Sequence, residues 1–185
     1  DRTPRAPADV DHPVGLYREA DIERARRNIE RHPWARRQLE SIIAGTRWWM
    51  ELPDDEIADW IPEGTPFRVC NCPNCGAQWG VRPWRFLPDG RAQCLRCETI
   101  FPNADFPETG VEEHINPLGE REQISYHEDA DGNHYRLSGL LRYGRIIKLD
   151  SLGNLGRAYA LTGESAYAEK VRRVLLRLAE VYPGY

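Results

Sequence analysis

The stretch CPNCGAQWGVRPWRFLPDGRAQCLRC, Cys72–Cys97, decides how the middle of this chain folds. It holds two Cys-x-x-Cys pairs that are separated by 18 residues, a spacing typical of a four-thiolate zinc site. Each short pair wraps a turn around one side of a tetrahedral ion, and the intervening segment returns the chain to present the second pair. The sequence therefore predicts that Cys72, Cys75, Cys94 and Cys97 bind a structural Zn²⁺ ion.

The residues between the two pairs carry turn signals. Gly76 follows the first pair, where a residue that is free to adopt a positive φ eases the tight turn. Pro88–Gly90 (Pro-Asp-Gly) has the composition of a hairpin turn, so we expect a zinc ribbon in which a small β-hairpin joins two knuckles. The aromatic residues Trp79, Trp84 and Phe86 either stack on bases or sugars or form the small core that such a ribbon otherwise lacks.

Five cysteines leave one thiol over. Cys70 lies two residues before Cys72 and could compete with it as a ligand, but Cys72 and Cys75 keep the knuckle spacing. The alternative to a metal site is a pair of disulfides. A bridge within each Cys-x-x-Cys pair would close only a very small loop and would restrict the unfolded chain little. The pattern therefore favours a metal.

Composition is that of a soluble globular protein with one domain, or one domain and a small module. Of 185 residues, 41% are hydrophobic and 29% are charged, with a net charge of −4. This acidic balance does not call for a nucleic-acid partner. No apolar run approaches the roughly 20 residues of a membrane span, so we expect no membrane partner, and no signal peptide is visible.

Apolar residues recur at helical spacing near the N-terminal end. Residues 20–49 predict two helices that are interrupted at Pro33, since proline is tolerated in a first helical turn but not in a helix interior. Arginines and glutamates alternate on these helices, which favours a solvated surface over an anion-binding face. Residues 54–60 predict a further short helix.

From Ile146 onward the pattern predicts a helix pair. Gly163 is placed as a glycine cap between the two helices, and the small residues Gly153 and Gly156 are expected to permit close helix approach. Before this pair, residues 104–145 show little periodicity. His127 and His134 there could suggest a second metal site or a base, but neither has a partner at a spacing typical of metal ligands.

The chain is therefore predicted to be mainly α with a small β insertion. Its four expected segments are an N-terminal helical segment 1–66, a zinc-ribbon insertion 67–103, an irregular connecting segment 104–145 and a helical hairpin 146–185.

Three stretches together resemble the heparinase II/III-like polysaccharide lyases, a group that includes alginate lyases. NLGRAYALTGESAYAEKVRRVLLRLAEVYPGY, Asn154–Tyr185, resembles a helix pair near the start of their catalytic toroid. ADIERARRNIERHPWARRQLESIIAG, Ala20–Gly45, resembles their N-terminal helices. CPNCG, Cys72–Gly76, is similar to a cysteine-containing insertion in some members, and the order of the three stretches carries the resemblance.

This resemblance implies an incomplete (α/α) toroid and β-elimination on uronic-acid glycans, with a secreted or periplasmic location. In the family an Asn or similar residue neutralises the uronate carboxylate, and Tyr and His transfer protons. Those residues lie downstream of the helix pair. The sequence stops at Tyr185, so no catalytic residue is carried over, and this chain alone is expected to be inactive. The remaining helices would come from the missing remainder of the enzyme or from further copies.

Under that resemblance, contact with an anionic polysaccharide is expected just before the last helices. The candidate residues combine cationic and aromatic groups and are Arg142, Tyr143 and Arg145. Arginine binds a carboxylate or sulfate through two parallel hydrogen bonds, and tyrosine packs on sugar faces. The alternative is that both arginines are ordinary surface residues.

Two functions of other classes remain as alternatives. One is a non-enzymatic zinc-ribbon module that binds a protein or nucleic acid, because arginines lie in the loop between the cysteine pairs. The other is a helical scaffold for assembly.

Overall fold

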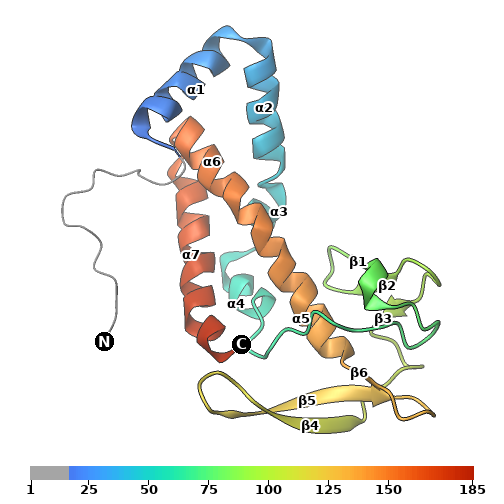
Figure 1. Ribbon diagram of the computed structural model, residues 1–185. Coiled ribbons are helices and arrows are strands. Elements are labelled where there is room, and N and C mark those ends of the chain that lie inside the picture. Colours follow the sequence, from blue (N-terminus) through green and yellow to red (C-terminus); the bar gives the residue numbers. More distant parts are fainter. Residues whose placement is uncertain (1–16) are drawn as a thin grey trace. The chain divides into compact units, whose positions relative to one another are not determined.

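Helices make up most of the regular structure in residues 17–185, which are the residues that the computed structural model describes (Figure 1). The mainly α prediction is confirmed, together with small antiparallel sheets. The described chain divides into two units. The first runs to Glu51 and includes Ser151–Val171, and the second consists of Leu52–Asp150 and Arg172–Tyr185.

The first unit is helical, and the predicted interruption at Pro33 separates its first two helices. They are α1 (Glu19–Arg31), α2 (Pro33–Ala44), α3 (Arg47–Glu51), α6 (Leu152–Thr162) and the beginning of α7 (Ser165–Val181). His32 between α1 and α2 has an extended backbone, and Pro33 occupies the first turn of α2, where its missing N–H costs no helical hydrogen bond.

Trp49 is the centre of this unit's core. Its side chain is fully buried, and its indole Nε1 donates a hydrogen bond of 2.8 Å to Ser151 Oγ. Leu155 on α6 is also fully buried. Arg26 on α1 donates two hydrogen bonds, of 2.6 and 3.1 Å, to the carbonyl of Ala160 near the end of α6. One arginine of the N-terminal helices therefore stabilises a helix terminus.

The predicted cap between the last two helices is confirmed. Gly163 has a left-handed backbone (φ 78°), and its N–H donates to the Tyr159 carbonyl at the end of α6. The expectation for Gly153 and Gly156 is wrong, because a Cβ at either position would meet no atom within 4 Å.

The second unit begins with the predicted short helix, which forms as η1 (Asp54–Glu56) and α4 (Ile57–Trp60). The ribbon follows. After the turn η2 (Trp79–Val81) come β1 (Trp84–Phe86), β2 (Ala92–Cys94) and β3 (Ile100–Phe101), which pair antiparallel in that order. The predicted hairpin turn joins β1 to β2 and is closed by a hydrogen bond of 2.8 Å from the Leu87 N–H to the Arg91 carbonyl.

The sequence predicts an irregular segment at residues 104–145, and this prediction is wrong. The segment holds a second hairpin and a helix. The elements are β4 (Gly110–Ile115), β5 (Arg121–Glu128), β6 (His134–Tyr135) and α5 (Leu137–Ile147), which begins well before Ile146. Strands β4, β5 and β6 pair antiparallel in order (Figure 1). The short η3 (Lys148–Ser151) links α5 to α6, and η4 (Tyr182–Gly184) follows α7.

The inward face of β4 explains why the hairpin has no hydrophobic alternation. Glu112 is half-buried there, while Val111 and Ile115 on the other face are 55% and 63% exposed. Glu112 forms a two-pronged ion pair with Arg136, at the start of α5. The face that a strand normally fills with apolar residues is thus filled by a paired charge, which a search for alternating hydrophobicity cannot detect.

Helix α5 holds the second unit together. The Glu108 carboxylate accepts from the N–H of Ser138 in its first turn, where a negative charge is favourable. On β5, Glu122 pairs with Arg142 of α5 at 3.1 Å. Gly144 allows the ring of Phe86 on β1 to pack directly on the helix, since a Cβ there would lie 2.2 Å from Phe86 Cδ1.

Within residues 17–185, none of the helices has both the length and the apolar composition that crossing a membrane requires.

The two classes of helical glycine should respond oppositely to alanine. Gly144→Ala is expected to lower the free energy of unfolding by about 1–2 kcal/mol, because the new methyl group displaces Phe86. Gly156→Ala, which meets open space, should raise it by roughly 0.5–1 kcal/mol through helix propensity. Urea unfolding curves check both, and a stabilising Gly144→Ala would contradict the packing of Phe86 on α5.

The Glu112–Arg136 pair should make stability depend on pH. The two hydrogen bonds from Arg136 hold the pKa of Glu112 below its usual range. This stabilisation is fully present above the unfolded pKa of about 4.3 and is lost as the pH falls through the lower folded pKa. Glu112→Gln should cost about 1 kcal/mol at neutral pH, and the difference from wild type should vanish in acid.

Glu113→Gln is the matched control for that measurement. Glu113 pairs with Arg121 on the exposed side of the same hairpin, with side chains 53% and 75% exposed. Its replacement should change the free energy of unfolding by less than about 0.5 kcal/mol at any pH. Equal effects of the two substitutions would show that the half-buried pair of Glu112 and Arg136 does not support the hairpin.

Candidate metal centre and the adjoining groove

The four paired cysteines come together as predicted. Their Sγ atoms all lie within 4.8 Å of one another. The Cys72 and Cys97 sulfurs are 3.7 Å apart, and those of Cys75 and Cys94 are 3.8 Å apart. Four sulfurs at about 2.3 Å from a central ion form a tetrahedron with edges of about 3.8 Å. The donor set therefore fits a metal ion, and these separations are far longer than a disulfide bond of about 2.05 Å.

Each knuckle turns through a left-handed residue directly after its second cysteine. In the first knuckle this residue is Gly76 (φ 66°), as predicted. In the second it is Glu98 (φ 60°), whose N–H donates to the Cys94 carbonyl just as that of Gly76 donates to Cys72. A non-glycine residue in this conformation costs about 1 kcal/mol. The two knuckles thus share one geometry, although glycine occurs in the first alone.

Hydrogen bonds around the sulfurs set their proton affinities. Burial raises the pKa of the Cys72 and Cys75 thiols. Burial also raises that of Cys97, but hydrogen bonds with the Thr99 side chain and N–H, together with weaker contributions from Cys75 and Asn74, outweigh it and lower the pKa to about 6. The Asn74 amide donates to Thr99 Oγ1 at 2.7 Å and so joins the two knuckles. A bound cation would offset the burial of the other sulfurs by favouring thiolates.

The metal centre is part of the hydrophobic core of the second unit. Cys72 and Cys94 are fully buried in one cluster with Phe101 of β3 and with Leu137 and Leu140 of α5. A metal ion bound here would link the two knuckles at the point where the ribbon packs against α5. Four protein sulfurs complete a tetrahedron, so that no position remains for water or substrate.

Cys70 stays outside the metal-binding group. It is buried in the same core, which raises the pKa of its thiol to about 12. Its backbone carbonyl accepts a 2.8 Å hydrogen bond from Trp84 Nε1. Trp84 also packs edge-on against Phe101. This aromatic residue of the ribbon loop therefore serves the small core, one of the two roles that its position suggested.

Arg142, Tyr143 and Arg145 are each partly buried, and each contacts different partners. Arg142 donates to Glu122 and to the Thr65 carbonyl. Arg145 donates to the Asp59 carbonyl at 3.1 Å, and its guanidinium lies over the Trp60 ring. Tyr143 packs edge-on against Phe86 and lines a groove beside the ribbon.

The two candidate histidines form no second metal site. His127 Nδ1 lies 3.0 Å from the Pro107 carbonyl, and His134 stacks on Tyr126 with ring centroids 3.7 Å apart. In the part of the chain that the structure describes, the four cysteines are the only group of three or more side chains suited to a metal.

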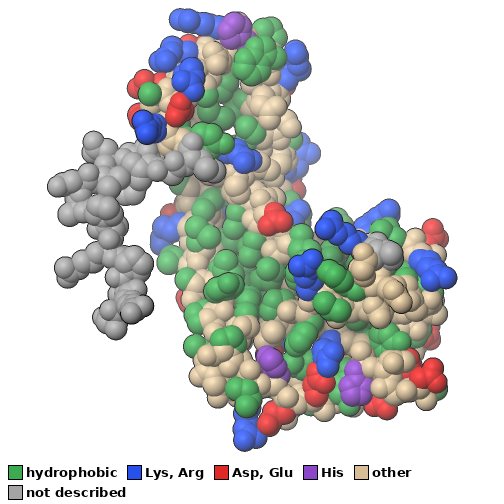
Figure 2. All heavy atoms as spheres, viewed as in Figure 1, with side chains coloured by type: hydrophobic (Ala, Val, Ile, Leu, Met, Phe, Trp, Pro, Cys, Tyr) green, Lys and Arg blue, Asp and Glu red, His purple; other side chains and the backbone are tan. Residues whose placement is uncertain are grey.

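A groove of about 350 Å³ lies between the ribbon and α5. We call it the ribbon groove, and the six lining residues that matter below are Arg68, Trp79, Arg82, Trp84, Tyr143 and Asp150. Figure 2 shows Arg or Lys side chains among hydrophobic ones over the region where Figure 1 draws β1 and β2. Spacing could not have revealed this groove, because its residues come from three separate parts of the sequence, at 68, 79–86 and 140–150.

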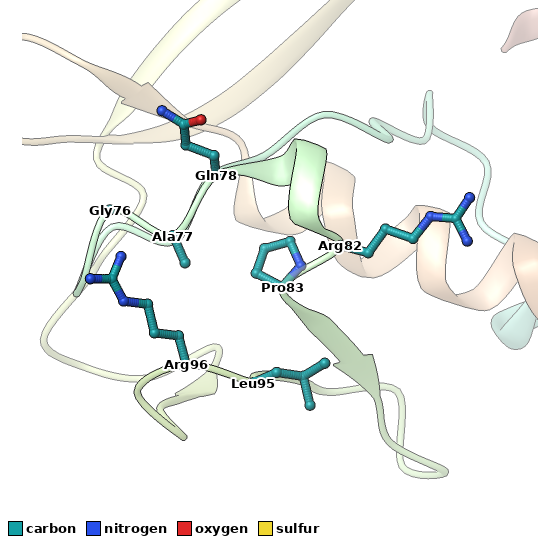
Figure 3. A pocket seen from close by; sticks show the side chains of 7 residues that line it. All are labelled: Gly76, Ala77, Gln78, Arg82, Pro83, Leu95 and Arg96. Carbon is teal, nitrogen blue, oxygen red and sulfur yellow. The ribbon is translucent and has the colours of Figure 1, made fainter.

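A second, more open pocket lies on the ribbon itself and includes Gly76, Pro83 and Arg96. In Figure 3 the side chain of Arg82 extends away from the other labelled side chains of this pocket. Arg82 lines both cavities, whereas Arg96 lines this pocket alone of the two.

Comparison with protein-family models, with curated proteins and with solved structures found no match to this chain.

The metal centre predicts a clear difference between two neighbouring cysteines. Cys75→Ser removes one of the four ligands and should release the metal during dialysis that leaves about one ion bound per wild-type chain. Cys70→Ala removes a buried thiol outside the group and should retain the ion. Elemental analysis of the purified proteins checks both, and loss of metal from Cys70→Ala with retention by Cys75→Ser would contradict the ligand set.

Proposed function

We propose that the ion is Zn²⁺ and that its role is structural. The observation that carries this proposal is the group of four cysteine sulfurs within 4.8 Å of one another, two of them fully buried in the core of the second unit. Zinc is the metal that such sulfur sets most often bind, and complete thiolate coordination is typical of sites that stabilise a fold. Copper and iron are the outcomes of elemental analysis that would overturn the assignment.

We further propose that the chain is the N-terminal portion of a polysaccharide lyase that cleaves uronic-acid glycans by β-elimination. The resemblance of the three stretches supports this proposal. So do the helix pairs observed in two of them, α1 with α2 and α6 with α7. Leu175 and Leu176 on α7 are about half exposed, at 49% and 52%. In an incomplete (α/α) toroid of paired helices, such residues would pack against the next pair.

In this proposal the chain contributes folding and substrate binding, while proton abstraction belongs to residues outside it. A saturated zinc site supplies no Lewis acid, because no coordination position is open. The proposed partner is an anionic polysaccharide, and the proposed location is secreted or periplasmic, as in the family that the sequence resembles.

The test compares two proteins. One is this chain alone, and the other is the longer product obtained when the gene is expressed with any coding sequence that follows residue 185. The longer protein should release unsaturated oligosaccharides from alginate or a glycosaminoglycan, seen as a rise in ultraviolet absorbance, and should leave a neutral glucan intact. The chain alone should bind alginate in an affinity gel without cleaving it.

Two results would count against this function. One is the absence of any elimination product from a panel of uronate polymers. The other is salt-dependent retention of the chain on nucleic acid with no retention on polysaccharide, which would favour a nucleic-acid-binding zinc ribbon instead.

A further inference from the structure

The ribbon groove presents an aromatic surface that the core does not use. Trp79 is partly exposed and lines the groove from the turn η2. Its backbone N–H donates to Asn71 Oδ1 at 2.8 Å, which holds the turn. Tyr143 lines the same groove from α5. Indole and phenol rings on two different elements can pack against the faces of a ring-shaped ligand.

Two guanidinium groups accompany these rings. The Arg68 guanidinium lies over the indole of Trp79, with Cζ 4.6 Å from the ring centroid. This stacking orders both side chains and still leaves the edge of the guanidinium able to donate. Among the residues that the structure describes, neither Arg68 nor Arg82 forms an ion pair with a carboxylate. The two arginines therefore bring more positive charge to the groove than the carboxylate of Asp150, which also lines it, can offset.

The backbone of Arg82 is held in an uncommon conformation. Its φ of 50° and ψ of 62° are left-handed, although the residue is not a glycine and precedes Pro83, which disfavours helical backbone angles. Its N–H donates to the Trp79 carbonyl at 2.8 Å. Residues held in such conformations cluster at ligand sites. Here the conformation projects a cationic side chain from the same turn that carries Trp79.

Asp150 adds a hydrogen-bond acceptor to the groove. A carboxylate accepts from the hydroxyl groups of a sugar ring. A ligand that suits all these groups has a ring face, hydroxyl donors and one anionic group.

We propose that the ribbon groove binds a uronate residue of a polysaccharide, with the sugar ring on Trp79 and its carboxylate between Arg68 and Arg82. The volume of about 350 Å³ lies within the range of small-ligand sites. The choice of a uronate rests on the proposed function, while the need for an anionic ring follows from the groove itself. The site is separate from the residues that would perform elimination, so it holds the polymer rather than reacts with it.

The experiment titrates the full chain with a mannuronate trisaccharide and follows binding by tryptophan fluorescence and by calorimetry. Mannotriose, which has the same kind of ring without the carboxylate, should bind at least about tenfold more weakly, because it cannot form the charged hydrogen bonds. Added salt should weaken binding of the acidic trisaccharide but not that of mannotriose.

Two variants locate the site. Arg82→Asn removes the charge while keeping a residue that tolerates the left-handed backbone, and it should weaken binding of the acidic trisaccharide about tenfold. Trp79→Ala should weaken it by a similar factor through lost stacking. Arg96→Gln, at the pocket of Figure 3, is the matched control and should bind as the wild type does.

Folding is checked by circular dichroism and metal content in each variant. If Trp79→Ala does not fold, Arg82→Asn carries the test by itself, because that side chain is exposed. Unchanged affinity in Arg82→Asn, or no binding of the acidic trisaccharide by the wild type, would overturn the proposal. Tighter binding of an oligothymidylate, lost in Arg82→Asn, would also overturn it and identify nucleic acid as the ligand.

The experiments distinguish failure of the groove proposal from failure of the proposed lyase function. If the longer gene product cleaves alginate while Arg82→Asn leaves binding unchanged, the groove proposal fails and the function stands. If the groove binds the acidic trisaccharide while no polymer is cleaved, the groove proposal stands and the function fails.

Discussion

The second unit is organised around four clustered cysteines, of which two are fully buried in its hydrophobic core and two pack against it. Cys72 and Cys94 are packed among the same apolar side chains as Leu137 and Leu140 of α5, so the metal centre and the core are one structure. The Cys72 and Cys97 sulfurs lie 3.7 Å apart and those of Cys75 and Cys94 lie 3.8 Å apart, so each sulfur has another as a near neighbour. Coordination of one ion would satisfy all four sulfurs, and metal binding would then be linked to the folding of the unit.

Helix α5 connects the cysteine cluster to the rest of the unit, because it contacts both the ribbon and the second hairpin. Its apolar side packs on the ribbon, and its glycine at position 144 lets Phe86 approach the backbone closely. Its arginines at positions 136 and 142 pair with glutamates on the two long strands of the second hairpin. Arg142, one of the residues expected to contact a ligand, is thus paired with a glutamate of the same unit. The charge is instead used to pair a hairpin whose inner face is polar.

Two chemistries follow from this arrangement and do not overlap. The metal centre is closed, so under the proposed function it stabilises the fold and takes no part in catalysis. The groove beside it remains open and combines ring faces with two guanidinium groups that form no ion pair with a carboxylate within residues 17–185. The ribbon would then serve binding indirectly, because the position of η2 and β1 beside α5 depends on the knuckles. Tyr143 is the one residue of the expected substrate-contact set that lines this groove.

The sequence by itself determined the features that depend on a few neighbouring residues. The cysteine spacing, the break at Pro33, the turn at residues 88–90 and the cap at Gly163 all follow from local backbone geometry, and each forms as expected. Only the tertiary structure decided the second hairpin, because the side chain that fills its inner face is an ionised glutamate whose partner, Arg136, lies 24 residues away. The groove likewise joins residues from 68 to 150, and no local pattern specifies which side chains from distant segments will meet.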